Sequence, residues 1–366
     1  MSINRKRRRL LSAAALILAA GGASVMWRGF MGRTNDNSGL PQGVPEIART
    51  SGSMPYRRFG ATGLQVSEIG FGAWGIGGNS YGPVERQTSL ATLALAEELG
   101  CNFVDTAQVY GDSEGVLGEF LNGRRSRWIV ATKYSGQPAG MTATLEEQLR
   151  RLGTDAVDYY QIHWAPGPDE HDLYAELDRL KQAGKARFVG VSLKSANDID
   201  YVIDNTAIDG VMVPFSLLDP DPFLMRMQRL RESGLAVIAR SVLKEGFLVG
   251  NLKRDAAFPD PTDQRHEWSR QRIERTVELV ENFRFLENES GSMVAAAVHY
   301  PLSFPEVSTV LIGTTSPAHA QSNFGRIPGG RLGVVSLRQI AALQSDLGLR
   351  TPTSLVGRLL RRVRSD

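Results

Sequence analysis

The sequence has few of the residues that form disulfide bonds or bind structural metal ions. Its 366 residues include one cysteine, Cys101, which cannot form an internal disulfide. No metal-ligand set is evident either, since His266-Glu267 is not followed by the second histidine of a zinc-binding helix. We therefore expect neither an internal disulfide nor a metal site, and Cys101, which lies in an apolar segment, is expected to be inert.

Positive charge is also scarce outside the N-terminus. The chain carries 42 Lys/Arg and 39 Asp/Glu, but residues 1–53 hold eight of the former and two of the latter. The first 53 residues thus have a net charge of +6, and the remainder has 34 basic and 37 acidic residues, a net charge of −3. A mildly acidic body without an RNA- or DNA-binding motif indicates no nucleic-acid partner.

The N-terminus has the pattern of an export signal. A basic run at 5–9 precedes an apolar stretch from Leu10 to about Ala20 and the small residues 21–23. The segment 7–11 is similar to a twin-arginine export motif, and the apolar run extends to Trp27, the lower limit for a membrane anchor. We interpret 1–29 as a signal-like or anchor segment, which predicts an exported, periplasmic or membrane-anchored body facing the periplasm. The alternative is a start at Met54 and a cytoplasmic protein.

Three further regions follow from composition. Residues 30–53 are rich in Gly, Asn, Pro and Ser and are interpreted as a linker. Residues 54–349 have the length of one α/β barrel. Residues 350–366 form a basic amphipathic tail, which predicts either a membrane-surface helix or a helix packed on the barrel.

Strand and helix patterns alternate from residue 54 onward, which predicts an α/β fold and, with eight units, a closed (β/α)8 TIM barrel. Two helices are additional, at 270–289 and 336–347, and 241–269 is a long rim loop. Expected strands are 68–72, 102–105, 128–132, 157–162, 186–191, 210–213, 235–239 and 308–312. Expected helices are 86–99, 113–121, 142–152, 169–183, 195–204, 220–233, 291–302 and 316–324.

Chemically useful side chains stand at three successive strand ends. Asp105 ends one apolar strand, and burying its charge is costly unless it is paired. Lys133 ends the next strand, His163 the one after, and Tyr110 follows Asp105 by five residues. A tyrosine hydroxyl, with a pKa of about 10, is a poor acid at neutral pH, and a nearby ammonium favours its phenolate. Barrel enzymes carry their chemistry at the C-terminal strand ends, so the four residues are the candidate catalytic set.

The chain resembles the aldo-keto reductases over roughly residues 54–347. The matching motifs lie at 56–67, 105–110, 151–158, 184–192 and 312–317, in family order and spacing. The resemblance implies a TIM barrel, a nicotinamide cofactor and an Asp/Tyr/Lys/His tetrad, here Asp105, Tyr110, Lys133 and His163. It implies reversible reduction of an aldehyde, ketone or sugar carbonyl by hydride transfer, with Tyr110 as general acid/base.

The positions that hold the nicotinamide amide depart from the family pattern. The resemblance aligns Ser192 and Leu193 with a Ser-Asn pair, and Met212 with a glutamine, so two of three polar anchors are apolar. Phe215 is expected to stack on the nicotinamide ring. An alternative is a nicotinamide-nucleotide-binding regulatory protein with vestigial turnover.

The adenosine end also departs from the NADP-selective pattern. The aligned residues Gly313, Thr314, His319 and Asn323 include no permanent cation. We expect NADP as the cofactor on the family resemblance, with NAD as the rival. The same resemblance assigns Gly72, Ser241, Leu243 and Gly246 to cofactor binding.

Substrate specificity is expected to come from the rim. Gly70–Gly75 matches a dinucleotide-binding glycine pattern, but no helix can start within the glycine-rich residues that follow, so we interpret it as a barrel strand entering a loop. Trp74, Tyr81 and Trp164 are expected to wall an aromatic, uncharged pocket for a small carbonyl or sugar substrate.

Overall fold

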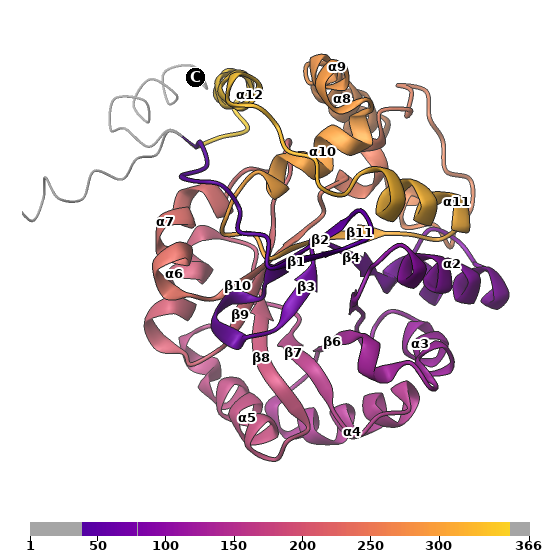
Figure 1. The fold of residues 1–366 in the computed structure, drawn as a ribbon, viewed down its shortest axis with the longest axis vertical. Coiled ribbons are helices and arrows are strands. Elements are labelled where there is room, and N and C mark those ends of the chain that lie inside the picture. Colours follow the sequence, from indigo (N-terminus) through magenta and orange to yellow (C-terminus); the bar gives the residue numbers. More distant parts are fainter. Residues whose placement is uncertain (1–38, 79, 352–366) are drawn as a thin grey trace, which may run out of the picture. The chain divides into compact units, whose positions relative to one another are not determined.

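The computed structural model describes residues 39–78 and 80–351, and these residues form a closed barrel of eight parallel strands (Figure 1). The strands run round the barrel in chain order from β4 to β11, and β11 pairs with β4 to close it. This confirms the predicted fold class. Their bounds are β4 Ile69–Gly72, β5 Phe103–Asp105, β6 Ile129–Tyr134, β7 Val157–Ile162, β8 Ala186–Ser192, β9 Gly210–Pro214, β10 Ala236–Arg240 and β11 Thr309–Gly313.

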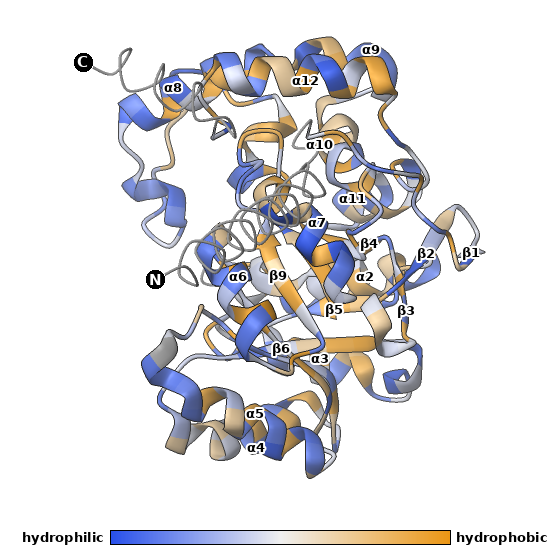
Figure 2. Ribbon diagram, turned by 90° about the vertical axis from the view of Figure 1, so that its left-hand side faces the viewer, coloured by the Kyte–Doolittle hydropathy of each residue, from blue (hydrophilic) through white to orange (hydrophobic). Residues whose placement is uncertain are grey.

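Helices follow the strands and cover the outside of the barrel. The principal ones are α2 Arg86–Glu98, α3 Ser113–Leu121, α4 Met141–Leu152, α5 His171–Gln182, α6 Ala196–Asn205, α7 Phe223–Ser233 and α10 Met293–Leu302. After β11 the expected single helix is instead a short α11, Pro317–Ala320, that continues as a π-helical turn, Gln321–Arg326. Apolar residues concentrate on barrel strands such as β5, β6 and β9, while α4 and α5 carry polar and apolar residues side by side (Figure 2).

The two additional helices are present with altered bounds. The segment expected as one helix is interrupted, giving α8 Arg270–Glu281, a short 3-10 turn and α9 Glu287–Ser290. The last described helix, α12, spans Val334–Asp346. Phe283 and Leu286, which lie in this interruption, are both buried in the core.

A small antiparallel sheet precedes the barrel. Its strands are β1 Arg49–Ser51, β2 Met54–Arg58 and β3 Gln65–Ser67. Val66 of β3 and Phe59, which follows β2, pack with inward-facing barrel residues such as Phe103 and Ile238, so they close the N-terminal end of the barrel. The interpretation of 30–53 as a linker therefore needs correction at its end, because β1 pairs with β2; residues 1–38 lie outside the described part of the chain.

The expected rim loop connects distant parts of the barrel. It contains two short 3-10 helices, Lys244–Val249 and Gln264–Glu267. Asp263 forms an isolated antiparallel bridge with Tyr81, and Gln264 N–H donates to Ser80 O at 2.8 Å. The loop is thus tied to the segment between β4 and α2.

Two sequence predictions concern residues that the structure does not describe. The signal-like segment at 1–29 lies outside the described range, as does the tail after Thr351. Within the described residues, no helix has the length and apolar character needed to cross a membrane.

Candidate active site

Strand register gathers three of the four candidate catalytic residues at one end of the barrel. Asp105 pairs with Ala131 of β6, and Lys133 pairs with Gln161 of β7. Phe103 and Ala131 belong to the inner core, and side chains alternate along a strand, so Asp105 and Lys133 also face inward. His163 directly follows β7.

Asp105 and Lys133 form a buried ion pair. The side chains are 4% and 1% exposed, and the Lys133 ammonium donates to Asp105 Oδ1. The ammonium also donates to Thr106 O at 2.7 Å, and Gln161 Nε2 donates to Asp105 Oδ2 at 3.0 Å. These contacts hold the Lys133 ammonium in one position, as the sequence argument from the cost of a buried charge requires.

Burial and charge act against each other on this pair. Burial alone lowers the pKa of Lys133, but the Asp105 carboxylate and the Tyr110 oxygen outweigh it and raise that pKa above its ordinary value. Burial raises the pKa of Asp105, against the opposing effect of Lys133 and Gln161. Lys133 therefore remains an ammonium at neutral pH and supplies a permanent positive charge to the site.

Tyr110 lies between Lys133 and His163. Its hydroxyl oxygen is 3.4 Å from Lys133 Nζ and 3.4 Å from His163 Nε2. The residue sits on the loop after β5, where Ser113 N–H donates to Tyr110 O at 3.1 Å. A Cβ added at Gly77 would lie 1.8 Å from Tyr110 O, so only glycine permits this approach of the two loops.

His163 is held as a neutral imidazole. Burial, followed by the charges of Lys133, Arg240 and Lys194, lowers its pKa to about 3. Ser135 Oγ lies 3.3 Å from Nδ1, and its hydroxyl can donate there. In that tautomer Nε2 carries the hydrogen and presents a donor beside the Tyr110 hydroxyl.

The expected substrate-pocket aromatics lie in two places. Trp74 is beside Tyr110, with ring centroids 6.1 Å apart, and Tyr81 packs on Trp74 at 5.3 Å. The guanidinium of Arg265 lies 5.0 Å from the Tyr81 ring centroid, which ties the rim loop to this wall. Trp164 follows His163, and its ring centroid lies 6.5 Å from that of Tyr134.

The expected nicotinamide anchors are divided between the barrel interior and the outer core. Ser192 is the last residue of β8 and is paired with Met212, whose side chain belongs to the inner core. Leu193 is fully buried in the outer core, so its side chain does not face the barrel mouth. Ser192 is therefore the polar side chain that remains among the three aligned positions.

The expectation that Phe215 stacks on the cofactor is wrong. Its side chain is fully buried, stacked on Phe223 at 4.1 Å and in contact with Tyr300 and Phe304. Phe215 falls on the outward side of β9, one residue beyond the strand, so it packs under the helices. The family resemblance assigned an aromatic at this point of the chain to the cofactor, but its side chain lies on the outer side of the barrel.

The loop after β10 has the strained backbone that is common at ligand clamps. Ser241, Lys244 and Glu245 have φ values of 57°, 46° and 56°, the positive-φ non-glycine residues of the described chain. Gly246, with φ of 97°, and Leu243, whose carbonyl accepts from Gly246 N–H, lie in the same turn. This geometry fits the expected role of 241–246 in holding a nucleotide.

The residues expected at the adenosine end separate into a buried pair and an exposed pair. Thr314 and Asn323 are buried, and Asn323 Nδ2 donates to Thr314 Oγ1 at 3.0 Å. Gly313, which ends β11, and His319 are exposed. Gly72 lies opposite Gly313, where a Cβ would come within 3.3 Å of Gly313 N.

With this geometry established, comparison with known proteins identifies the family. The aldo/keto reductase family model matches residues 68–328. The chain belongs to the aldo/keto reductase family. It is 30% identical to an L-galactose dehydrogenase of Arabidopsis thaliana over 75% of this chain and 88% of that protein. It is 29% identical to an uncharacterized oxidoreductase of Bacillus subtilis over 80% of this chain and 96% of that protein.

Solved structures of the family share the fold. Glycerol dehydrogenase AKR11B4 from Gluconobacter oxydans superposes with a TM-score of 0.68 at 24% identity, covering 85% of this chain and 98% of that one. The holo form of aldo-keto reductase AKR11C1 from Bacillus halodurans gives 0.67 at 24% identity, covering 83% and 99%. The match to the family model, together with the curated relatives, makes this chain an aldo/keto reductase enzyme that acts on carbonyl groups.

Two residues of the site were missed from the sequence. Gln161 lies two residues before His163 on β7, and Arg240 ends β10; both face inward by the period of two. That period was available in the sequence, since inward positions near a strand's C-terminal end point toward the site. Among described residues no group of His, Cys, Asp or Glu is arranged to hold a metal ion.

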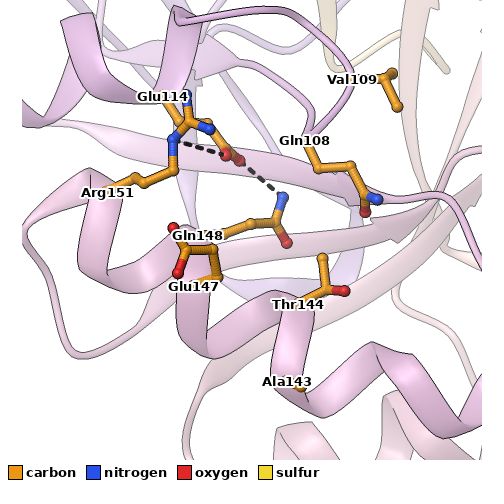
Figure 3. Close-up of a pocket in the computed structure, with 8 residues that line it drawn as sticks. All are labelled: Gln108, Val109, Glu114, Ala143, Thr144, Glu147, Gln148 and Arg151. Carbon is orange, nitrogen blue, oxygen red and sulfur yellow. Dashed lines mark hydrogen bonds and ion pairs between the residues drawn. The ribbon is translucent and has the colours of Figure 1, made fainter.

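A surface groove lies behind the Tyr110 loop but contains none of the four tetrad residues (Figure 3). It is lined by Gln108, Val109 and residues of α3 and α4. Glu114 in this groove accepts from Gln148 Nε2 and Thr132 Oγ1, both at 2.7 Å. These bonds tie α3 to α4 and β6, and so support the strand that carries Lys133.

Proposed function

We propose that this aldo/keto reductase interconverts an aldehyde, ketone or sugar carbonyl and its alcohol with NAD(P), using Tyr110 as general acid/base. The observation that carries the proposal is the position of the Tyr110 hydroxyl, 3.4 Å from both Lys133 Nζ and His163 Nε2. The dihydronicotinamide supplies the hydride when bound. Ser192, the 241–246 loop and the residues around Gly313 would hold the nucleotide.

The protein residues supply the proton and orient the substrate. The His163 Nε2–H donates to the substrate carbonyl oxygen. The Tyr110 hydroxyl gives its proton to that oxygen as the alcohol forms, and the Lys133 ammonium stabilises the resulting phenolate. In the reverse direction the phenolate takes the proton back. General acid catalysis of this kind contributes about 10²–10⁴-fold.

Tyr110→Phe tests the proposal because it removes the hydroxyl and retains the ring. We expect turnover of an aldehyde panel with NADPH to fall at least 10²-fold, while NADPH binding, measured by fluorescence titration, is retained. Tyr81→Phe is the matched control, since Tyr81 packs on Trp74 at 5.3 Å and is not placed to transfer the proton. Equal turnover in wild type and Tyr110→Phe would refute the proton-transfer role.

The apolar character of Leu193 and Met212 supports a second candidate function, a nicotinamide-nucleotide-binding regulatory protein with vestigial turnover. Neither side chain offers a hydrogen bond to an amide. The same titration and aldehyde panel decide between the two: nucleotide binding without turnover in the wild-type protein favours the regulatory function.

We propose NADP as the cofactor, with NAD as the competing choice. Relatives of both kinds exist, including an NADP(+) aldo-keto reductase of Schizosaccharomyces pombe at 28% identity and an NADH-specific methylglyoxal reductase of Escherichia coli at 26%. Parallel titrations with the two nucleotides test the choice. Trp74 and Tyr81 support an uncharged sugar or aldehyde as the substrate.

The basic and apolar N-terminal pattern supports export of the body to the periplasm, either free or anchored. Fusing residues 1–53 to a reporter that is active only after export tests this, with Arg7→Lys and Arg8→Lys together as the control for a twin-arginine route. A reporter that stays inside the cell would favour the cytoplasmic alternative. Flotation of the protein with anionic vesicles, with and without residues 352–366, tests membrane binding by the tail.

A further inference from the structure

Arg240 places a positive charge at the mouth of the barrel. It is the last residue of β10, on which Ala236 and Ile238 face the inner core while Val237 and Ala239 face the outer core. The same alternation directs Arg240 inward, at the level of the strand ends that carry the tetrad. Its charge acts on His163, and those of Tyr110 and Asp105 act on it.

The guanidinium is fixed by neutral groups. Nη2 donates to Leu193 O and Nη1 donates to Ser241 Oγ, both at 3.3 Å. No carboxylate within residues 39–78 and 80–351 lies at ion-pair distance from it. The carboxylates whose charges reach it are paired elsewhere: Asp219 with Lys244 at 2.9 Å, and Glu245 with Arg272.

The charges of the tetrad do not compensate Arg240. Asp105 and Lys133 neutralise each other, and His163, with its pKa near 3, is neutral. The site therefore holds one surplus positive charge. Burial lowers the pKa of Arg240, which indicates that solvent screens this charge incompletely.

The nicotinamide ring must lie close to the same strand ends. Hydride transfer requires reacting carbons about 3–3.5 Å apart, and the substrate oxygen is held at Tyr110 and His163. Arg240 also donates to the backbone of Leu193, beside Ser192, the polar residue that remains of the expected amide anchors. An oxidised nicotinamide ring carries a positive charge, whereas the reduced ring is neutral.

We propose that Arg240 makes this enzyme bind the reduced cofactor more tightly than the oxidised one, which raises the reduction potential of the bound couple above that of the free couple. The inference rests on the proposed NAD(P)-dependent function and deepens it. The fixed guanidinium repels the oxidised ring and leaves the reduced ring unaffected, while its hydrogen atoms offer the ring amide a partner in place of Leu193 and Met212. Arg240 is thus a determinant of cofactor redox preference.

The test measures dissociation constants without any substrate. The full-length protein is first stripped of bound nucleotide. It is then titrated with NADPH, followed by fluorescence, and with NADP+ in competition with NADPH. NADH and NAD+ are measured in the same way. We expect wild type to prefer the reduced form by on the order of tenfold or more, which for a two-electron couple is about 30 mV per factor of ten. Arg240→Gln should reduce that preference about tenfold, and Arg240→Lys should keep most of it.

Arg187→Gln is the control, since Arg187 lies at the opposite end of the barrel, is 55% exposed and pairs with Asp158. It should leave the preference unchanged, and thermal melts check that each variant is folded. An unchanged preference in Arg240→Gln, or equal weakening of both redox forms, would overturn the inference. If Arg240→Gln raises only the KM for carboxylate-bearing aldehydes, the inference would also be overturned, and Arg240 would instead be assigned to binding an anionic substrate. If wild type binds none of the four nucleotides, the proposed function itself fails.

Discussion

Removing the charge of Asp105 should destabilise this enzyme more than a typical core substitution does. Asp105→Asn leaves the Lys133 ammonium, 1% exposed, without a negatively charged partner among the described residues: the new amide oxygen, Thr106 O and the Tyr110 hydroxyl are all neutral acceptors. Breaking one side of a buried ion pair costs about 3–5 kcal/mol. That is a large fraction of the roughly 5–15 kcal/mol that stabilises a protein domain.

The companion variants separate pairing from burial. Lys133→Met alone leaves Asp105 as the uncompensated charge and should cost about as much, again roughly 3–5 kcal/mol. Because burial raises the pKa of Asp105, that cost should shrink as the pH falls and the carboxyl becomes neutral. Asp105→Leu combined with Lys133→Met removes both charges, so it should cost much less than the sum of the two single losses.

Urea denaturation at pH 7 measures these free energies of unfolding, and aldehyde turnover is followed in parallel. Asp158→Asn is the matched control, a buried aspartate at the opposite barrel end whose partners Arg125 and Arg187 are 27% and 55% exposed. Asp158→Asn should lower the free energy of unfolding by less than Asp105→Asn does, because those arginines stay solvated. It should also leave aldehyde turnover unchanged. A double variant as unstable as the sum of the single ones would refute the argument that unpaired charge dominates the cost.

Two further predictions concern His163 and the Tyr110 loop. His163 has a folded-state pKa near 3 against an ordinary 6.5, so the unfolded state binds one more proton between those values and stability falls as the pH is lowered through that window. His163→Asn should remove about 1.4 kcal/mol per pH unit of this slope, measured by urea titrations from pH 6.5 to 4; an unchanged slope would contradict the lowered pKa. Gly77→Ala should shift the Tyr110 loop and lower turnover at least tenfold, since its Cβ would lie 1.8 Å from Tyr110 O. Gly167→Ala, with nothing within 4 Å, should be neutral, and wild-type turnover in Gly77→Ala would show that the loop adapts freely.

The local pattern was sufficient for the barrel. Short apolar strands alternating with amphipathic helices predicted all eight strands of the closed sheet, because each βα unit buries its apolar face only against the next. Helix ends were less well determined. The break before α9 and the π-helical turn after α11 were not predicted from the sequence; each holds a buried residue, Phe283 and Asn323 respectively.

The tetrad was predicted from the sequence because each member ends or follows a strand, and parallel strands bring those ends together. Whether a side chain faces into or out of the barrel was harder to predict where the strand bounds were uncertain by one residue. Phe215 was assigned to the cofactor although it packs on Phe223 outside the barrel, and Arg240 was overlooked although it faces the site. A shift of one position along a strand exchanges inward and outward.

The sequence by itself determined the fold class and the family resemblance, and it singled out the four candidate catalytic residues, because these depend on residue type and spacing along the chain. Only the tertiary structure decided the electrostatics of the site: that Asp105 and Lys133 neutralise each other, that His163 is neutral, and that Arg240 has neutral partners. Pairing and desolvation depend on distances and burial between residues far apart in the chain, and no spacing along the chain encodes them.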